Sequence, residues 1–503
     1  MRIATAAELR EADRQAIDDL GIPGACLMQS AGEALARACA GAQRIAFLCG
    51  KGNNGGDGFA AARLLAVAGK EITVLLTTSE EEITGLAATH LAPLRASGVT
   101  VAPFSDAALA GHDLLVDCLL GTGTRGAPRG LVAEAIRAAN ASGIPLVACD
   151  LPSGVDADTG EVPGDAIRAR ATVTLSALKP GLLLYPGAEL VGELTLAPIG
   201  LPILTPPTQE LTTIGWVRAT LPKRQQGRDA NKGAFGTVLV VAGARGMAGA
   251  AVLTATAALR AGAGLVYLAV PESLVATVAA LSAEVVVRPL PETPDGTHGG
   301  EGALETLLPL VARADAIALG PGLTAGAAVQ DFVEALLTHT NLPLVIDADG
   351  LNCIAQRAAL LSRLSGRERV LTPHPGELGR LLGLPTRAVQ ASRTEVVGRV
   401  AQNFGSVTLL KGARTLVASP AGQLYYNREG SVSLATAGSG DVLTGVIAAL
   451  LAQGLTAENA ARCGAYWHAL AGESLPVGSL AGEIRDALPA ARLRLESGDI
   501  GDL

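Results

Sequence analysis

Asp441 lies in the segment "LATAGSGDVLTGVIAALLAQGL", residues 434–455, where two glycines and a serine come directly before it. The apolar second half of this segment predicts a helix that begins near Asp441. Backbone N–H groups at the start of a helix attract anions such as phosphate. A carboxylate beside such a site can accept the proton of a hydroxyl group that attacks a phosphoryl group. The pattern favours phosphoryl transfer to an alcohol over the simpler alternative, a carboxylate that only caps the helix.

Three glycine-rich loops in the first half offer a second set of polar groups. They read "NNGGDG" (53–58), "LLGTGTRGAPRG" (119–130) and "CDLPSGVDADTG" (149–160), and each follows a short apolar run. The glycines allow close approach of a ligand. The first loop matches neither the GxGxxG dinucleotide pattern nor a Walker loop. Tight turns are the alternative, but they need fewer glycines and fewer polar residues, so we favour ligand loops.

Asn54, Asp117 and Ser153 belong to these strand ends and offer only oxygen ligands. Oxygen donors suit a hard cation such as K⁺ and do not suit zinc. Asp150 comes at the same rim. Taken singly each residue is a common loop residue, but together they predict one site.

Short apolar runs that alternate with Ala-rich helical stretches predict parallel strands buried on both faces. In the first half the expected strands are 44–49, 71–77, 112–119, 144–150, 171–178 and 193–199. In the second half they are 236–242, 264–270, 314–319, 343–348, 369–372 and 406–410, with long helices over 248–261 and 441–453. Because ligands bind beyond the carboxyl ends of such strands, the loops of each half are expected to meet at one edge of a sheet.

A break in this rhythm divides the chain. The segment 198–209, "PIGLPILTPPTQ", contains four prolines and is the best candidate for a linker. At 503 residues the chain is longer than one compact domain usually is. We therefore expect an α/β protein of two layered domains, residues 1–212 and 213–503, each with a mainly parallel sheet. No internal repeat relates the two halves.

Composition excludes several classes of partner. Hydrophobic residues make up 49% of the chain, charged residues 17%, and the net charge is −8. The absence of a general basic field argues against nucleic acid or an anionic membrane as a partner. Seven scattered cysteines without a CxxC pair fit reduced thiols. The charged start lacks the apolar core of a signal peptide, and no charge-free run could span a membrane. We expect a cytoplasmic protein.

The three loops of the first half, followed by "LKPGLLLYPGAELVGELTLAPIG", resemble the NAD(P)H-hydrate epimerase family over nearly all of residues 1–210. The resemblance implies a Rossmann-like fold and a hydrated nicotinamide dinucleotide as substrate. It implies that Asn54, Asp117 and Ser153 hold K⁺ and that Asp150 is the acid/base at the nicotinamide ring. The substrate contacts that it implies are Asn53, Asn54, Gly55, Gly56, Asp57, Gly121, Thr122, Gly123, Thr124, Arg125, Gly126, Ala127 and Asp150.

In the second half, "LGPGL", "VIDADGLN", "LTPHPGEL", "LLKGARTLVA" and "ATAGSGDVLTG" resemble the NAD(P)H-hydrate dehydratase family of the ribokinase-like superfamily, over nearly all of 215–495. Ser439 stands where the family often has Thr, which keeps the hydroxyl. The resemblance implies Asp441 as the general base, Mg²⁺ as cofactor and ADP as co-substrate, although the sequence does not decide between ADP and ATP. The implied substrate contacts are Gly322, His374 and Asp441. The implied nucleotide contacts are Lys411, Gly412, Ala413, Arg414, Thr415 and Gly440.

Together the two halves predict repair of hydrated NADH and NADPH. The first would interconvert the R and S hydrates, and the second would dehydrate the S form while ADP is converted to AMP and phosphate. The alternative is a ribokinase-like small-molecule kinase with a dinucleotide-sensing first domain, which would accumulate a phosphorylated product. A non-catalytic scaffold would be expected to lack Asp150 or Asp441. The expected partners are the hydrates, ADP and, in a homo-oligomer, further copies of the chain.

Overall fold

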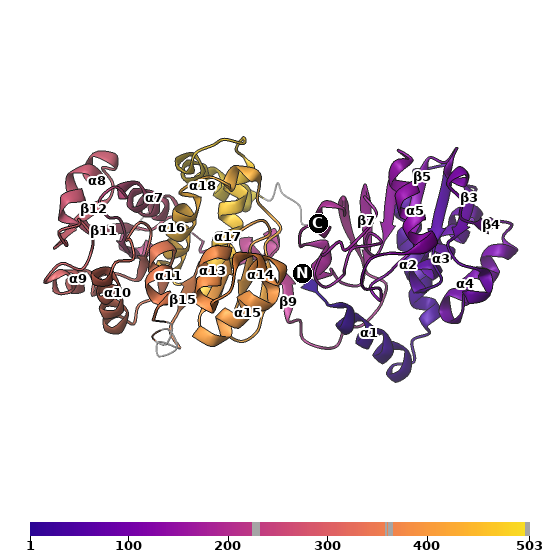
Figure 1. Cartoon of the computed structure of the whole chain (residues 1–503), viewed down its shortest axis with the longest axis horizontal. Helices are drawn as coiled ribbons and strands as arrows, with labels where there is room; N and C mark the ends of the chain where they lie inside the picture. Colours follow the sequence, from indigo (N-terminus) through magenta and orange to yellow (C-terminus); the bar gives the residue numbers. More distant parts are fainter. Residues whose placement is uncertain (224–231, 358–359, 361–365, 498–503) are drawn as a thin grey trace. The chain divides into compact units, whose positions relative to one another are not determined.

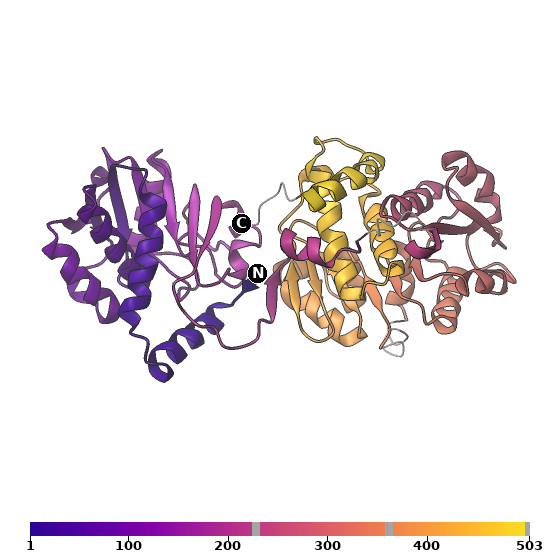
Figure 2. The same ribbon diagram turned by 180° about the vertical axis from the view of Figure 1, so that it is seen from behind.

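The structure, a computed structural model, describes residues 1–223, 232–357, 360 and 366–497 (Figure 1). It divides into two compact units between Thr208 and Gln209, and Met1 groups with the second. We call residues 2–208 the N-terminal unit and the described residues from 209 on the C-terminal unit; Figure 2 shows both from behind. Among the described residues, no helix combines the length and the apolar character that crossing a membrane requires.

The N-terminal unit is built on a seven-stranded sheet in the order β4-β3-β2-β5-β6-β7-β8, and all of its neighbouring strands are parallel. The strands are β2 (Arg44–Cys49), β3 (Glu71–Leu76), β4 (Thr100–Pro103), β5 (Leu114–Cys118), β6 (Leu146–Cys149), β7 (Ala171–Leu175) and β8 (Glu193–Ala197), after a first short strand β1 (Arg2–Ile3). The helices are α1 (Ala6–Arg14), the π-helical η1 (Gln15–Asp19), α2 (Gly24–Cys39), α3 (Asn53–Val67), α4 (Gly85–Ala96) and α5 (Gly130–Ala141). Short 3₁₀ turns are η2 (Glu80–Glu82), η3 (Asp106–Leu109), η4 (Pro180–Leu182) and η5 (Gly187–Glu189).

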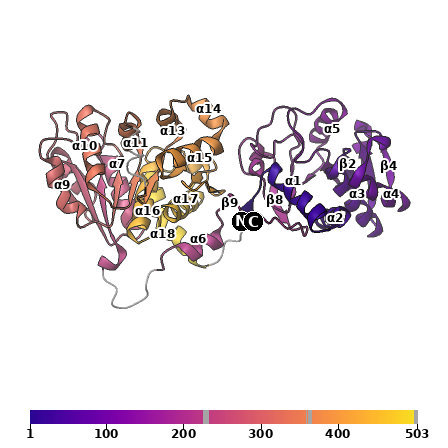
Figure 3. The same cartoon turned by 90° about the horizontal axis from the view of Figure 1, so that it is seen from below.

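Alternation along β2 shows why helices cover both faces of this sheet. Ile45, Phe47 and Cys49 pack with residues of α2, α3 and α4, whereas Ala46 and Leu48 pack with residues of α5. Successive side chains of a strand point to opposite faces, so a wholly apolar strand needs cover on both. Figure 3 shows α5 on one side of the sheet and α2 on the other.

The C-terminal unit has a sheet in the order β9-β18-β17-β16-β15-β14-β13-β10-β11-β12. Its pairs are parallel except β16 with β17 and β17 with β18. The strands are β9 (Gln209–Leu211), β10 (Thr237–Val241), β11 (Leu265–Pro271), β12 (Val286–Leu290), β13 (Ala316–Leu319), β14 (Leu344–Ile346), β15 (Arg369–Leu371), β16 (Val407–Leu410), β17 (Leu416–Ala418) and β18 (Leu424–Tyr426).

Helices cover both faces of this sheet as well. They are α6 (Ile214–Thr220), α7 (Ala248–Arg260), α8 (Val275–Leu281), α9 (Ala303–Val311), α10 (Ala327–His339), α11 (Ala348–Ala355), α13 (Pro375–Leu382), α14 (Thr386–Ala391), α15 (Arg393–Phe404), α16 (Ser439–Ala452), α17 (Ala457–Glu473) and α18 (Ala481–Ser497), with 3₁₀ turns η6 (Lys232–Phe235), η7 (Glu272–Leu274) and η8 (Val432–Leu434). Residues of α7, α16, α17 and α18 form one apolar core with the sheet. Helices α10, α11, α13 and α15 lie on the other side (Figure 3).

The twelve strands expected from apolar runs are all present, within three residues at each end, and the two long helices are confirmed as α7 and α16. The strands that the sequence did not predict are β4 and β12 at sheet edges, the short antiparallel pair β17 and β18, and β1 and β9. Edge strands are more exposed to solvent than central strands. This holds for β4, and for Arg288 and Pro289 of β12. They therefore lack the unbroken apolar run that identifies a buried strand.

The α/β fold with parallel sheets is confirmed, and the division of the units lies within the expected linker region. Residues 209–211 form β9, which pairs with β18 and so belongs to the second unit rather than to the first.

Candidate active sites

A cavity of about 650 Å³ lies at the carboxyl ends of the strands of the N-terminal unit. The loops after β2 and β5 and the residue after β6 all contribute to it, as expected for an open parallel sheet. Of the predicted contact residues, those that line it are Asn53, Asn54, Asp57, Gly121, Thr122, Gly123, Thr124 and Asp150. The three loops singled out in the sequence therefore meet at one place.

Asp150 has a fixed orientation at this cavity. Its backbone is left-handed, with φ of 67°, a conformation that non-glycine residues rarely adopt. Its Oδ1 accepts a hydrogen bond from the Leu175 backbone N–H at 3.0 Å and forms an ion pair with Lys179. Oδ2 makes no hydrogen bond within the described part of the unit, so it is the oxygen left available to a ligand.

Lys179 is the partner that holds Asp150, and its side chain is only 1% exposed. Its Nζ also donates to Thr174 Oγ1 at 3.0 Å and to the Leu175 carbonyl at 2.9 Å. An ammonium with three acceptors is well compensated for its burial. The sequence analysis quoted the "LKPG" stretch but did not assign Lys179 to the site.

Among the other carboxyl groups that line the cavity, Asp57 and Asp13 have raised pKa values. Burial, together with the charges of Asp150 and Asp13, raises the pKa of Asp57 well above its ordinary value. Burial and the charge of Asp150 also raise the pKa of Asp13, which lies on α1. Lys179 opposes both shifts without cancelling them. The cavity thus combines an ion-paired carboxylate with two carboxyl groups that favour the protonated form.

The three oxygen residues predicted for K⁺ come together beside the cavity. Asp117 is fully buried and accepts from Ser153 Oγ at 2.6 Å and from the Ser153 backbone N–H at 2.8 Å. Burial raises its pKa to about 6 in spite of those hydrogen bonds. Asn54 Nδ2 donates to the Leu120 carbonyl at 2.8 Å, while its buried Oδ1 has no donor among the described residues. An orphaned oxygen beside a buried carboxyl group fits a hard monovalent cation.

Several predicted contact residues do not line the cavity. A side chain on Gly55 would meet the Gly50 carbonyl at 2.1 Å, and one on Gly56 would meet Met28 Sδ at 2.5 Å, so both allow close packing of α3. Arg125 is exposed and lies 3.5 Å from Asp158. Gly126 lines a small neighbouring depression, and Ala127 packs on Gly164. Their roles as substrate contacts stay predictions.

Residues of α1 and η1 also line the cavity, which the sequence analysis missed. They are Leu9, Arg10, Asp13 and Ile17. The spacing of Leu9, Asp13 and Ile17 places them on one helical face, which is a usable signal. Nothing local in the sequence shows that this face meets the loops that follow the strands.

In the C-terminal unit, Asp441 is the third residue of α16, as the glycine pattern predicted. Gly438 caps the helix with φ of 88°, which glycine tolerates without strain. Burial, followed by the charge of Asp347, raises the pKa of Asp441 to about 7, while Lys411 opposes the shift. A carboxyl group with a pKa near 7 suits a general base near neutral pH.

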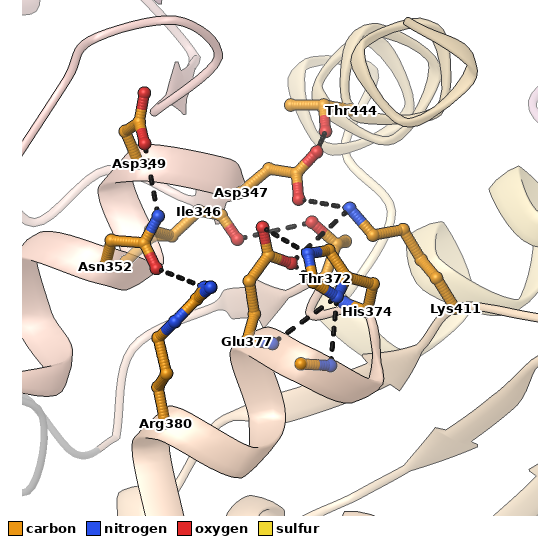
Figure 4. Close-up of polar contacts among 11 residues, drawn as sticks. Ile346, Asp347, Asp349, Asn352, Thr372, His374, Glu377, Arg380, Lys411 and Thr444 are labelled. Carbon is orange, nitrogen blue, oxygen red and sulfur yellow. Dashed lines mark hydrogen bonds and ion pairs between the residues drawn. The ribbon is translucent and has the colours of Figure 1, made fainter. Parts of the chain in front are cut away.

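Lys411 lies close to the start of α16 and forms ion pairs with Asp347 before α11 and Glu377 of α13 (Figure 4). Its Nζ lies 2.6 Å from Asp347 Oδ1 and 3.9 Å from Glu377 Oε2. Asp347 is buried, and its Oδ2 accepts from Thr444 Oγ1 of α16 at 2.7 Å. Burial disfavours the charge of Lys411, but the carboxylates of Asp347 and Glu377 outweigh it and raise the pKa of the lysine.

His374 caps helix α13. Its Nδ1 accepts from the backbone N–H groups of Gly376 at 3.0 Å and Glu377 at 3.4 Å, so Nδ1 carries no proton. Partial burial and the charges of Lys411 and Arg380 lower its pKa. The neutral ring therefore carries its proton on Nε2, 3.4 Å from Glu377 Oε1, where it can donate to a ligand.

The remaining predicted residues of the C-terminal unit follow the strands β13 and β16 or lie at the start of α16. A side chain on Gly440 would lie 3.2 Å from Lys411 Nζ, so these two predicted residues meet. Residues 412–415 form the turn between the antiparallel strands β16 and β17, where Thr415 Oγ1 donates to the Gly412 carbonyl at 3.2 Å and Arg393 donates to the Arg414 carbonyl at 3.2 Å. Ala413 lies within this turn. Gly322 follows β13 and packs against Met247, without a described contact to Asp441.

Four residues of this second group were missed by the sequence analysis: Asp347, Glu377, Thr444 and His468. His468 Nε2 lies 3.2 Å from Ser439 Oγ, and burial lowers its pKa to about 4, so the ring is neutral. The first three stand inside the quoted motifs "VIDADGLN", "LTPHPGEL" and "ATAGSGDVLTG", which was a signal that could have found them.

Comparisons with known proteins cover both units. The family described as YjeF-related protein N-terminus matches residues 24–181, and the family described as NAD(P)H-hydrate dehydratase matches 238–485. A bifunctional NAD(P)H-hydrate repair enzyme of Moorella thermoacetica is 42% identical over 520 residues, covering 99% of this chain and 97% of the relative. One of Thermofilum pendens is 37% identical over 484 residues, covering 94% and 92%.

Solved structures are similar to part of the chain. One is the ADP/ATP-dependent NAD(P)H-hydrate dehydratase of Bacillus subtilis co-crystallised with ATP/Mg²⁺. It is 30% identical, with a TM-score of 0.47, over 57% of this chain and 99% of that chain.

Proposed function

Since the chain belongs to the bifunctional NAD(P)H-hydrate repair enzyme family, we propose that it restores hydrated NADH and NADPH to the intact dinucleotides. Its N-terminal domain (1–212) interconverts the R and S hydrates, and its C-terminal domain (213–503) dehydrates the S form. The observation that carries this proposal is that each unit holds a carboxyl group equipped for proton transfer, Asp150 in the first and Asp441 in the second. An epimerase and a stereospecific dehydratase complement each other, because the dehydratase alone would leave one epimer unused.

In the first domain, Asp150 is the acid/base. Water adds to an enamine at the carbon next to nitrogen, so the hydrate carries its hydroxyl group on that ring carbon. Inverting this carbon requires proton transfer to or from oxygen, which one positioned carboxylate can perform. Oδ2 of Asp150 is available for this proton transfer, because Oδ1 forms the ion pair with Lys179. The loop residues that line the cavity, Gly121 to Thr124 among them, bind the dinucleotide.

In the second domain, Asp441 takes the proton of the ring hydroxyl as that oxygen attacks the terminal phosphoryl group of ADP. The N–H groups at the start of α16 stabilise the negative charge that develops on the transferred group. Phosphate then leaves with the ring oxygen, the neighbouring ring carbon gives up a proton to water, and the electron pair of that C–H bond forms the double bond, giving NAD(P)H, AMP and phosphate. His374 donates to the hydrate through Nε2, Gly322 borders it, and residues 411–415 with Gly440 bind the nucleotide.

Two cations fit the residues present. K⁺ is held by Asn54, Asp117 and Ser153, supported by the orphaned Asn54 Oδ1 and the buried Asp117 carboxyl group; it supplies positive charge that fixes the neighbouring loops. For Mg²⁺, no set of three or more His, Cys, Asp or Glu side chains in the described parts of the chain is arranged to hold a metal. We propose that Mg²⁺ is held by the nucleotide phosphates with at most one or two carboxylates, as is common for nucleotide enzymes, and offsets phosphate charge.

The cellular location and the assembly also belong to the proposal. A cytoplasmic location is supported by seven cysteines that are all free thiols. A homo-oligomer stays a prediction, which light scattering on the purified full chain tests directly.

The experiment that tests the function is the absorbance of the dihydronicotinamide band after mixing the protein with both epimers of NADH hydrate, Mg²⁺, K⁺ and either ADP or ATP. Full recovery of NADH with one nucleotide establishes both activities and identifies the phosphoryl donor. Recovery that stops at the S fraction, after correction for spontaneous epimerisation, removes the epimerase from the proposal. A stable phosphorylated product without NADH would instead support the small-molecule kinase.

A further inference from the structure

The cavity of the N-terminal unit holds more carboxyl groups than a single proton acceptor requires. Asp13 from α1, Asp57 from α3 and Asp150 after β6 all line it, and Lys179 faces them. The other charged groups that line the cavity are Arg10, Lys51 and Glu82. If Asp13, Asp57 and Asp150 were all ionised, their mutual repulsion in a partly buried space would be unfavourable. At least one of them is therefore expected to keep its proton.

The contacts separate Asp150 from the other two. Asp150 is ion-paired with Lys179 and accepts from the Leu175 N–H, whereas Asp13 and Asp57 have neither kind of contact among the described residues. Of these two, Asp57 is the one whose pKa is raised well above the ordinary value, by burial and by the charges of Asp150 and Asp13. Asp57, which favours its proton, and Asp150, which is ion-paired, thus line the same cavity from two different elements.

Building on the proposed epimerase function, we propose that Asp57 is a second catalytic residue, which protonates the departing hydroxyl group while Asp150 deprotonates the water that replaces it on the opposite face of the ring. In the first step the carbon–oxygen bond breaks, its electron pair takes the proton of Asp57 to form water, and the ring nitrogen lone pair forms a C=N bond. In the second step water attacks that carbon, the C=N electrons return to nitrogen, and Asp150 Oδ2 takes the released proton.

Over the two reaction steps, one water molecule is lost, one water molecule is gained, and one proton moves from Asp57 to Asp150. Exchange with solvent in the open cavity returns the proton. Inversion at the carbon requires the departing and the entering oxygen to use opposite faces, so a second proton-transfer group complements Asp150. Asp57 was predicted from the sequence only as a substrate contact, so the proposal gives it an additional role.

The test is the full chain with Asp57→Asn, which keeps the shape of the side chain but cannot donate a carboxyl proton. Epimerisation is followed by chromatographic separation of R and S hydrates, and dehydration of pure S hydrate by the same preparation is the internal control. We expect epimerisation at saturating hydrate to fall about 100-fold or more, with dehydration unchanged. Asp106→Asn, an exposed aspartate of the same unit, is the matched control and keeps full epimerisation.

Two further measurements keep the test decisive if Asn disturbs folding. In H₂¹⁸O the wild-type chain is expected to incorporate one ¹⁸O per inversion, because the hydroxyl oxygen is replaced. Asp57→Glu retains a carboxyl group and is expected to recover measurable epimerisation. The inference is overturned if inversion proceeds without ¹⁸O, if Asp57→Asn keeps its rate, or if its rate falls only in proportion to lost affinity. A wild-type chain that does not interconvert the epimers would instead overturn the proposed function itself.

Discussion

The Nζ of Lys411 and the Oδ1 of Asp347 lie 2.6 Å apart, and they join β16 to the start of α11 across 64 residues of sequence. The same Asp347 accepts from Thr444 of α16 through its other oxygen. Asp347 therefore fixes both the lysine expected at the nucleotide and the helix whose start is expected to bind phosphate. We infer that this carboxylate positions the dehydratase site.

Lys411→Met is expected to destabilise the C-terminal unit by about 3 kcal/mol, because it leaves a buried carboxylate without its cation. Dehydration should be lost while epimerisation continues. The measurement is urea unfolding with both activities recorded on each variant. The control is the double variant Asp347→Asn/Lys411→Met, which removes the buried charge as well and is expected to regain part of the lost stability. A single variant as stable as the wild type would contradict the buried ion pair.

Dehydration is expected to depend on pH through Asp441. Its pKa is raised to about 7, so the base form increases as the pH rises through 7 and the carboxyl group is protonated below it. The rate at saturating substrate should therefore fall about tenfold for each pH unit below 7 and level off above it. Asp441→Asn should lose at least about 100-fold above pH 7, with a smaller difference from the wild type at lower pH, where the wild-type carboxyl group is protonated.

A pH titration of the dehydration rate from 5.5 to 8.5 in steps checks this expectation on the S hydrate alone, so that epimerisation does not limit it; the chosen range brackets the pKa of about 7. The control is the epimerase rate of the Asp441→Asn chain, which should match the wild type. A rate that does not change between pH 6 and pH 8 would show that Asp441 is not the titrating base.

Local patterns were sufficient to place Asp150 after a strand and Asp441 at the start of a helix, where the structure has them. They were also sufficient for the central strands, whose burial on both faces leaves an unbroken apolar run. The edge strands β4 and β12 have no such run, since part of each faces solvent.

Partners from distant segments could not be predicted in this way. Lys179 meets Asp150 across 29 residues, and Lys411 meets Asp347 across 64. Each pair depends on how loops of different strands pack, which no local spacing encodes. Asp13 joins the cavity from a helix that the sequence analysis treated only as a charged start.

Potassium is expected to stabilise the N-terminal unit through Asn54. Asn54→Ala removes the orphaned Oδ1 together with the hydrogen bond from Nδ2 to the Leu120 carbonyl. In the wild type, exchange of Na⁺ for K⁺ should raise the unfolding temperature by a few degrees, as expected for a ligand that binds only the folded state. In Asn54→Ala this response should disappear.

Calorimetry is the suitable readout, because both tryptophans of the chain, Trp216 and Trp467, lie in the C-terminal unit and would not report on the N-terminal one. Asn140→Ala is the matched control. It also loses side-chain hydrogen bonds to the backbone, with the Ala166 carbonyl and the Arg168 N–H, but far along the sequence from the predicted cation ligands. It should unfold at a lower temperature and still respond to K⁺. An equal K⁺ response in both variants would exclude Asn54 as a ligand.

Gly440 should tolerate no side chain, although it lies in a helix where alanine is ordinarily the better residue. A Cβ there would lie 3.2 Å from Lys411 Nζ and 3.6 Å from Asp347 Oδ2. Gly440→Ala is therefore expected to displace the lysine and reduce dehydration at least about tenfold, since small misplacements at a reacting centre have large effects.

Gly398→Ala in α15 is the matched control, because nothing lies within 4 Å of its Cβ position. Gly398→Ala should keep full activity and gain about 0.5 kcal/mol of stability. Rates of S-hydrate dehydration and urea unfolding on both variants check the contrast, and equal activity in the two would mean that the space above Lys411 has no role in catalysis.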